Sequence, residues 1–268
     1  MEKFSVLSWN VQGKTNPTGH TSYKKVLAEL SKSDFDIIVL QEMSGAERKL
    51  KKFQAENPYN IFISKLNKNS WLNKNGFNHN VVLSKHPIIN AQEIIFSDFS
   101  KKRLLENCLR TDIKIKDKTL RLYNCHLAVY KAGPAVRLKQ LEFILSDSQN
   151  HDGPIIICGD LNPIMPKAGL KRNVIRLWHR QPKPEMRIKD ELIIKDEWEL
   201  LNETATKFGF KEALDLSLPT WSPFKSANWE IFKLKLDWFL IKNLGVNNVE
   251  LGDYISDHRP IKTVCYIK

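Results

Sequence analysis

The sequence predicts a protein of the α/β class, and three of its features lead to that prediction. A strand, a helix and a second strand follow one another between residues 4 and 40, and this order implies a parallel, right-handed crossover. The short run Pro154–Cys158 is apolar, rich in isoleucine and closed by Gly159, which is typical of a buried strand. Asp160 and Asn162 come directly after it, where open α/β sheets usually present their ligand site.

Two polar side chains are expected to project from one edge of the N-terminal part of the sheet. The first strand is predicted at residues 4–11 and ends at Asn10. Residues 20–33 carry apolar side chains at helical spacing, and the strand at residues 35–40 is followed by Glu42. Because parallel strands end at the same edge of a sheet, Asn10 and Glu42 should lie close together.

The middle of the chain is predicted to contain further strands and two helices. His126 stands at the end of the second strand of a hairpin, and Pro134 opens a helix at a position where proline is favoured. The expected elements are a charged helix at 44–56, strands at 80–84 and 88–96, a hairpin of 104–115 and 118–127, and a helix at 134–148.

A basic insertion separates this part from the last elements. Residues 163–210 interrupt the alternation of strands and helices, although residues 191–208 have the pattern of an amphipathic helix. A strand expected at 234–241 is interrupted by Asp237, which a purely apolar core would not require. We therefore expect one domain over residues 1–268, with a basic insertion at about 163–210.

Composition limits the class of protein. The chain has 268 residues, a net charge of +12 and a pI near 9.4, and such a surface attracts polyanions such as nucleic acids. No apolar run is long enough to span a membrane, and the first strand leaves no room for a signal peptide. The widely spaced cysteines suggest free thiols in a reducing compartment, so a cytoplasmic protein is expected; they are Cys108, Cys125, Cys158 and Cys265.

A set of polar residues lies at or near the ends of apolar strands. Each has an ordinary structural explanation, since asparagine and aspartate favour turns and a histidine can be satisfied within a core. Eight such coincidences would be unusual, because buried ionisable groups are costly unless they are paired or bound to a metal. The set comprises Asn10, Glu42, His126, Asp160, Asn162, Asp237, Asp257 and His258.

Six short motifs contain these residues and follow one another along nearly the whole chain: Leu7–Asn10, Leu40–Glu42, Asn124–Leu127, Gly159–Asn162, Leu236–Phe239 and Ser256–His258. Each is weak alone, but together they resemble the endonuclease/exonuclease/phosphatase superfamily of metal-dependent phosphoesterases, which includes pancreatic deoxyribonuclease-like and exonuclease III-like enzymes. The resemblance implies a four-layer α/β sandwich. Two facing mixed sheets would be covered by helices on the outside, with the site at one end between them.

The resemblance also implies a metal site. Glu42 is expected to be the principal ligand of Mg²⁺, with Asn10 and Asp257 nearby and with Mn²⁺ as an alternative ion. Magnesium favours oxygen ligands and binds through one or two carboxylates together with substrate phosphate. This chemistry agrees with the residue types at the three positions.

The remaining motif residues are expected to be catalytic. Asp237 would hold His258 in one tautomer and raise its pKa, and His258 would act on the attacking water or donate a hydrogen bond to the phosphoryl group. Asp160 competes with His258 for the role of general base. Asn162 would position the phosphate or the nucleophile, and His126 completes the set.

Two departures argue against one branch of the superfamily. His126 stands where the pancreatic deoxyribonuclease-like, sphingomyelinase-like and many bacterial members carry histidine, whereas the abasic-site branch has a tyrosine motif in that region. Gln12 stands where the abasic-site branch carries an acid. Specificity for abasic sites is therefore not expected.

The favoured function is a Mg²⁺-dependent nuclease, most simply an endonuclease, with DNA favoured over RNA. The alternative is a phosphatase or phosphodiesterase of a small or lipid phosphoester, similar to a phosphoinositide or to sphingomyelin. A third hypothesis is a non-catalytic binding module on the same fold, although the expected chemical groups are all present.

Residues 167–189 favour the nuclease, because they carry eight lysines or arginines against one acid, Glu185. Basic side chains can follow a phosphate backbone while an aromatic ring stacks on a base. The residues expected to do so are Arg172, Arg176, Trp178 and Arg180. A solvated basic loop without a partner is the alternative interpretation.

Overall fold

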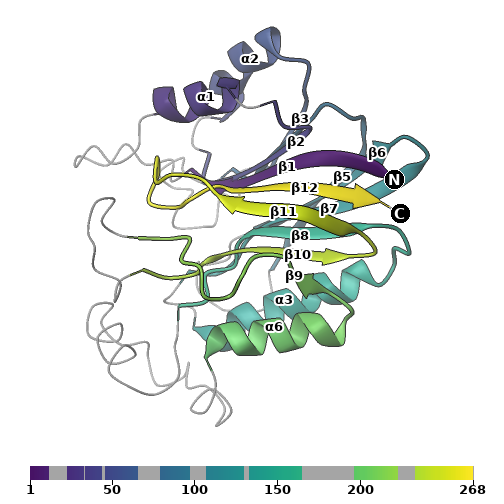
Figure 1. Ribbon diagram of the computed structural model, residues 1–268, viewed down its shortest axis with the longest axis vertical. Coiled ribbons are helices and arrows are strands. Elements are labelled where there is room, and N and C mark those ends of the chain that lie inside the picture. Colours follow the sequence, from purple (N-terminus) through teal and green to yellow (C-terminus); the bar gives the residue numbers. More distant parts are fainter. Residues whose placement is uncertain are drawn as a thin grey trace.

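The computed structural model of the protein describes residues 1–11, 23–32, 34–43, 46–65, 79–96, 107–129, 133–164, 196–222 and 233–267. In these residues two six-stranded mixed β-sheets face each other, and helices lie on the outer side of each sheet (Figure 1). The expected four-layer α/β sandwich is therefore confirmed.

The first sheet has the strand order β11-β12-β1-β2-β4-β3. Only β1 and β2 pair in parallel, as expected for the strand–helix–strand unit at the N-terminus, and the other neighbours are antiparallel. Its strands are β1 (Glu2–Asn10), β2 (Ile37–Gln41), β3 (Asn60–Ile63), β4 (Val81–Ser84), β11 (Gly245–Leu251) and β12 (Ile261–Ile267).

The second sheet has the strand order β5-β6-β7-β8-β10-β9. Here β7 and β8 form the parallel pair, and β6 and β7 form the expected hairpin. Its strands are β5 (Ile88–Ile95), β6 (Asn107–Ile115), β7 (Lys118–His126), β8 (Ile155–Asp160), β9 (Lys211–Glu212) and β10 (Asp237–Lys242).

Four helices among the described residues cover the two sheets from outside (Figure 1). Helices α1 (Tyr23–Lys32) and α2 (Ala46–Glu56) lie on the first sheet, and α3 (Pro134–Ser148) and α6 (Glu197–Lys207) lie on the second. None of these helices is long and apolar enough to cross a membrane.

The central strands are apolar throughout because each of their faces is buried in a different core. In β2, Ile37 and Val39 point into the core between the sheets, whereas Ile38 and Leu40 point toward the helices. Alternate side chains of a strand point to opposite faces of the sheet. A strand between two layers therefore has no solvent-facing side to carry polar residues, and its polar residues collect at its ends.

One expected strand begins later than predicted, and the start of one expected helix lies outside the described residues. The strand predicted at 234–241 begins at Asp237, because the backbone N–H groups of Leu236 and Asp237 donate to Thr220 Oγ1. The described part of the helix predicted at 191–208 is α6, and residues 165–195 lie outside the described residues. All four cysteines are buried free thiols, as expected.

Candidate active site

The parallel strand pairs bring the predicted site residues to one end of the sandwich. Asn10 ends β1 beside Gln41 of β2, and Glu42 follows directly. In the other sheet, His126 at the end of β7 is in register with Asp160 at the end of β8. On its other side Asp160 faces Asp237, because β10 runs antiparallel to β8.

Asn10 links the two sheets across the site. Its fully buried amide Nδ2 lies 3.3 Å from Glu42 Oε1 and 2.9 Å from Asp160 Oδ2, and it donates to both carboxylates. Glu42 has a φ of 56°, a left-handed conformation uncommon for a residue with a side chain. Its side chain remains 22% exposed. The geometry leaves one carboxylate buried, at Asp160, and one partly open to solvent, at Glu42.

Asp237 and His258 form a hydrogen-bonded pair. His258 Nδ1 lies 2.8 Å from Asp237 Oδ2, and both side chains are buried. Burial alone would lower the pKa of His258, but the nearby carboxylates of Asp237, Asp257 and Asp160 hold it well above its usual range. The contact through Nδ1 leaves Nε2 facing Asp160, whose Oδ2 is 3.7 Å away.

Asp160 lies at the centre of the site. Burial, together with the neighbouring carboxylates of Asp237 and Glu42, raises the pKa of Asp160 to about 8, although His258 and the Asn10 amide act in the opposite direction. A carboxyl with such a pKa exchanges its proton near neutral pH, as a general acid or base must.

His126 lies between the two sheets and contacts both carboxylates. Its Nε2 is 3.6 Å from Glu42 Oε1 and 3.8 Å from Asp160 Oδ2. Burial lowers the pKa of His126, even though Glu42 raises it. A neutral imidazole at this position can orient the carboxylates without adding a positive charge to the site.

Asn162 adopts a left-handed backbone conformation, with a φ of 54°. Its N–H donates to Asp160 Oδ1 at 2.9 Å, which closes a turn around the carboxylate. Its side-chain Nδ2 donates to the carbonyl oxygen of Leu127 at 3.1 Å. The amide nitrogen is therefore used to join two loops, and the amide oxygen is the group left to meet a phosphate or nucleophile.

Asp257 is oriented by an aromatic residue that the sequence motifs did not single out as functional. Trp221 Nε1 donates to Asp257 Oδ2 at 3.0 Å. The other oxygen, Oδ1, is buried and has no hydrogen-bond partner among the described residues. Burial raises the pKa of Asp257. No local pattern in the sequence marked Trp221, because its contact with Asp257 joins positions 36 residues apart.

Ser256 is a second residue whose role was missed. Its Oγ accepts from Trp9 Nε1 and from the backbone N–H of His258, and it lies 2.8 Å from the carbonyl oxygen of Asn10. One buried hydroxyl therefore joins the end of β1 to the loop that carries Asp257 and His258. Its place in the Ser256–His258 motif was the available signal.

The donor set fits a hard divalent cation. The buried Oδ1 atoms of Asp257 and Asp237 lack hydrogen-bond donors in the described part of the chain, and Glu42 is partly open to solvent. Oxygen donors of this kind are those that Mg²⁺ favours. Asp160, Asp237 and His258 also place one donor atom each within 4.8 Å of the others. The hydrogen bond between Asp237 and His258 makes that trio better suited to proton transfer than to holding magnesium.

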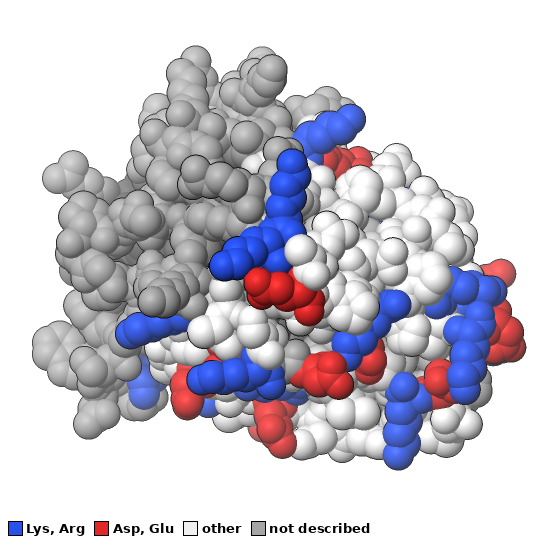
Figure 2. All heavy atoms as spheres, turned by 90° about the horizontal axis from the view of Figure 1, so that it is seen from above, with Lys and Arg blue, Asp and Glu red and all other residues white. Residues whose placement is uncertain are grey.

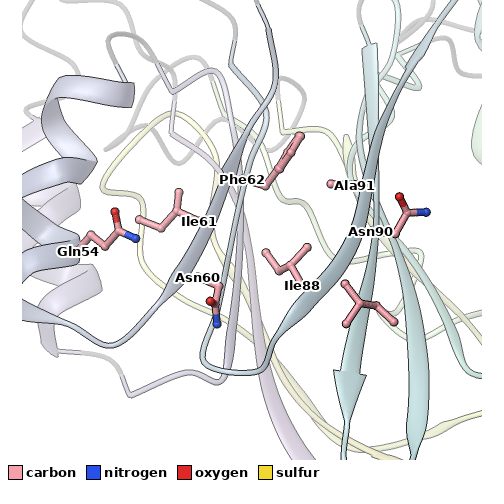
Figure 3. A pocket seen from close by; sticks show the side chains of 8 residues that line it. Gln54, Asn60, Ile61, Phe62, Ile88, Asn90 and Ala91 are labelled. Carbon is pink, nitrogen blue, oxygen red and sulfur yellow. The ribbon is translucent and has the colours of Figure 1, made fainter.

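Other features of the molecule do not form part of this site. The four residues expected to contact nucleic acid lie outside the described residues; they are Arg172, Arg176, Trp178 and Arg180. A groove of about 530 Å³ lies between β3 and β5, lined by residues such as Phe62 and Ile88 (Figure 3). None of its lining residues is titratable, so the groove does not offer acid–base chemistry.

The sequence model of the Endonuclease/Exonuclease/phosphatase family matches residues 7–258. The matched segment contains all eight strand-end residues, and the last of them, His258, is its final residue. Among curated proteins, no sequence match was found.

Solved structures share the fold at low sequence identity. A D. rerio TDP2 humanized by 14 mutations is 19% identical with a TM-score of 0.66, covering 98% of this chain and 99% of that chain. D. rerio TDP2 complexed with a single-strand DNA product is 18% identical with a TM-score of 0.67, covering 99% and 100%. An endonuclease/exonuclease/phosphatase protein from Beutenbergia cavernae is 15% identical with a TM-score of 0.71, covering 100% and 72%.

Proposed function

The chain belongs to the endonuclease/exonuclease/phosphatase family, and from that premise we propose that it is a Mg²⁺-dependent nuclease that hydrolyses phosphodiester bonds of DNA. Members of this family are hydrolases of phosphoester bonds and generally depend on a divalent metal. The observation that carries the proposal is the Asp237–His258 hydrogen bond placed directly beside Asp160 and the Asn10–Glu42 contact.

Glu42 would hold the metal, with Asn10 and Asp257 completing the protein's donors. A bound divalent ion neutralises charge that builds up on the phosphoryl group and on the leaving oxygen. The partly exposed Glu42 carboxylate and the unsatisfied Oδ1 of Asp257 support this assignment. Mn²⁺, which also accepts oxygen ligands, is expected to replace Mg²⁺.

His258 and Asp160 would handle the protons. Asp237 accepts from His258 Nδ1, so the charged ring directs its Nε2–H toward the Asp160 side of the site. From there it would donate to a phosphoryl oxygen of the substrate. Asp160 faces His258 Nε2 and has a pKa raised to about 8, so its ionised form would take the proton of the attacking water. His126 and Asn162 would then position the carboxylates and the phosphate.

Nucleic acid is the proposed substrate, and DNA is favoured over RNA. The chain has a net charge of +12, and the D. rerio TDP2 of the same fold was solved with single-strand DNA product. On the described face seen in Figure 2, basic and acidic side chains are interspersed. The strongest sequence signal for a polymeric substrate therefore remains the segment 167–189. The four buried thiols agree with a cytoplasmic location.

A substrate panel tests the proposal. Plasmid DNA, single-stranded DNA, RNA and a small phosphodiester are each incubated with the full chain, with Mg²⁺, with Mn²⁺ and with EDTA. Metal-dependent cleavage of DNA faster than of the small phosphodiester is the expected result. Hydrolysis of the small phosphodiester alone would favour the alternative function, an enzyme that acts on a small or lipid phosphoester. If no substrate is hydrolysed with either metal, the proposed function is refuted.

A further inference from the structure

A buried ion pair joins the two helices that cover the second sheet. Arg137 lies in the first turn of α3, and Glu197 is the first residue of α6. The guanidinium donates from Nε to Glu197 Oε1 at 2.6 Å and from Nη2 to Oε2 at 2.9 Å. The two side chains are 0% and 2% exposed. Both charges are therefore withdrawn from water and fixed in the two-pronged geometry that arginine and carboxylate favour.

The same pair also holds the backbone of two loops. Arg137 Nη1 donates to the carbonyl oxygens of Ala128, at 3.3 Å, and Val129, at 3.4 Å. Glu197 Oε2 accepts from the backbone N–H of Ile164 at 3.1 Å. Each side chain thus uses part of its hydrogen-bonding capacity on its partner and part on a loop.

Both loops begin at residues of the candidate active site. Ala128 lies two positions after His126, and Ile164 lies two positions after Asn162. The loops are also joined to each other, because Asn162 Nδ2 donates to the carbonyl oxygen of Leu127. A displacement of either loop would therefore be transmitted to the side chain that precedes it.

A second residue of α3 acts on the same loop. Gln140 Oε1 accepts from the backbone N–H of Ala128 at 2.9 Å, and Gln140 is fully buried. The N–H and the carbonyl group of Ala128 are thus both held by side chains of one helix. Helix α3 contributes no group to the site itself, yet it determines where the segment after β7 lies.

Stability alone does not explain a buried ion pair here. The cost of removing two charges from water offsets most of their attraction, and apolar residues of similar volume often replace such pairs without loss. An apolar pair could join the helices, but it could not bind carbonyl and N–H groups at fixed points. We therefore propose that Arg137 and Glu197 are positioning residues, which fix the loops at 127–129 and 161–164 and through them the active site. The inference rests on the proposed function of that site.

The test replaces the pair with apolar residues in the variant R137M/E197L. The helices can still pack and the variant should fold, but its thermal midpoint should fall, because Ala128, Val129 and Ile164 lose their hydrogen-bond partners. The kcat on DNA should fall on the order of 10²-fold, the scale expected for a displacement of about 1 Å at a catalytic group. A kcat within twofold of wild type in a folded variant would overturn the proposal.

The matched control is R121M/D112L. Arg121 and Asp112 form a comparable pair across β6 and β7, with an Nε–Oδ1 distance of 2.8 Å and an Nη2–Oδ2 distance of 3.1 Å. Arg121 is five residues from the site end of β7, roughly 16 Å at the usual rise of a strand. Removal of the Arg121–Asp112 pair should leave kcat unchanged. Equal losses of kcat in the two double variants would show a general effect of lost ion pairs and overturn the proposal.

Hydrogen exchange provides a readout that does not depend on activity. Peptides covering 127–129 and 161–164 should exchange faster in R137M/E197L, while peptides from the central strands keep wild-type rates. Unchanged exchange of the two loops in R137M/E197L would overturn the inference. If these loops exchange faster in the double variant but the wild type itself cleaves no substrate, only the proposed function is refuted. If the double variant does not fold, R137K takes its place, since lysine keeps the charge but loses the fork. The same changes in kcat and in loop exchange are then expected of R137K, and their absence would overturn the proposal.

Discussion

Glu42 combines two properties that rarely occur together, a left-handed backbone and a partly exposed carboxylate in an otherwise buried cluster. Strained conformations of this kind cost on the order of 1–3 kcal/mol and persist where the surrounding structure enforces them. The backbone strain places the carboxylate beside the amide of Asn10. This arrangement favours a role for the charge of Glu42 over a role in packing.

Glu42→Gln is expected to abolish nearly all activity with little change in the thermal midpoint. Glutamine keeps the shape and the contact with Asn10 but loses the charge that would bind Mg²⁺. Activity and thermal unfolding are measured together, and EDTA should abolish activity of the wild type. Glu250→Gln on the exposed part of β11 is the matched control and should remain active. Full activity of Glu42→Gln would show that the metal is held elsewhere or not needed.

Asp237→Asn and His258→Ala should each lower kcat by on the order of 10²-fold or more, the scale of general acid–base catalysis. Because Asp237 acts through the imidazole that it orients, the double variant should be little worse than either single variant. Steady-state kinetics of the four proteins measure the coupling. Losses that add fully would assign Asp237 a task separate from His258.

Single residues were predictable where a polar type interrupts an apolar pattern. Asp237 could be found because it stands in an apolar run, and Asp160 because it follows one. The role of Trp221 could not be found, since its bond to Asp257 joins two positions that no local pattern connects. The same holds for Arg137 and Glu197, which are 60 positions apart.

At the scale of elements, the parallel pairing of β7 and β8 depends on one glycine. Gly159 has a φ of 121°, and a Cβ atom there would lie 2.2 Å from the carbonyl oxygen of Cys125. A contact so short requires the strands to move apart. Because Cys125 and Gly159 directly precede His126 and Asp160, such a movement would separate these two side chains.

Gly159→Ala should destabilise the protein by roughly 3 kcal/mol or more, from backbone strain and the clash together. Gly209→Ala is the matched control. Its φ of 83° is also positive, but the nearest atoms lie 3.5 Å away in the flexible side chain of Lys242, so a loss of only about 1 kcal/mol is expected. Urea unfolding measures both. Similar losses of stability in the two variants would show that the positive φ alone, without the close approach to Cys125, accounts for the requirement for glycine at position 159.

Element types were predictable because each central strand is apolar on both faces and each helix on one. Element ends were less so. The start of β10 is displaced by the hydroxyl of Thr220, which takes two backbone N–H groups in place of a neighbouring strand. Thr220 lies 16 or 17 positions before the N–H groups that it binds. Such a distant competitor for backbone hydrogen bonds does not change the local pattern of apolar residues from which the strand was predicted.

At the scale of the whole molecule, the excess of positive charge is expected to act through residues 167–189. Replacing Arg172, Arg176 and Arg180 with glutamine should weaken DNA binding. It should also flatten the dependence of log affinity on log salt by roughly two to three units, at about 0.9 per phosphate contact on duplex DNA and 0.7 on single strands. Binding is measured across a salt series with an inactive protein.

The control for this variant changes the same amount of charge elsewhere. Lys25, Lys51 and Lys52 are exposed on α1 and α2, and their replacement with glutamine should leave the salt dependence nearly unchanged. Cleavage of a small phosphodiester should be normal in both variants. Equal slopes in the two triple variants would mean that the basic segment is merely solvated.

The family resemblance, carried by six motifs over nearly the whole chain, supplied the four-layer arrangement that periodicity alone could not. Local patterns specify strands and helices, but the number of sheets and their facing arrangement depend on contacts between distant segments. The pairing of β1 with both β2 and β12 is one such contact, since its two partners come from opposite ends of the sequence.

The pairing of β1 with β2 and β12 also affects the order in which the protein folds during its synthesis. Strand β1 lies between β2 and β12, with Glu2 opposite Ile267, so the first sheet cannot close while the chain is still being synthesised up to residue 260. Pairings between such distant segments form slowly, because a long loop must be closed first. The Asp237–His258 pair can form only after residue 258 has been made. The candidate site would therefore be assembled late, after both strands beside β1 and the segment carrying His258 have been made.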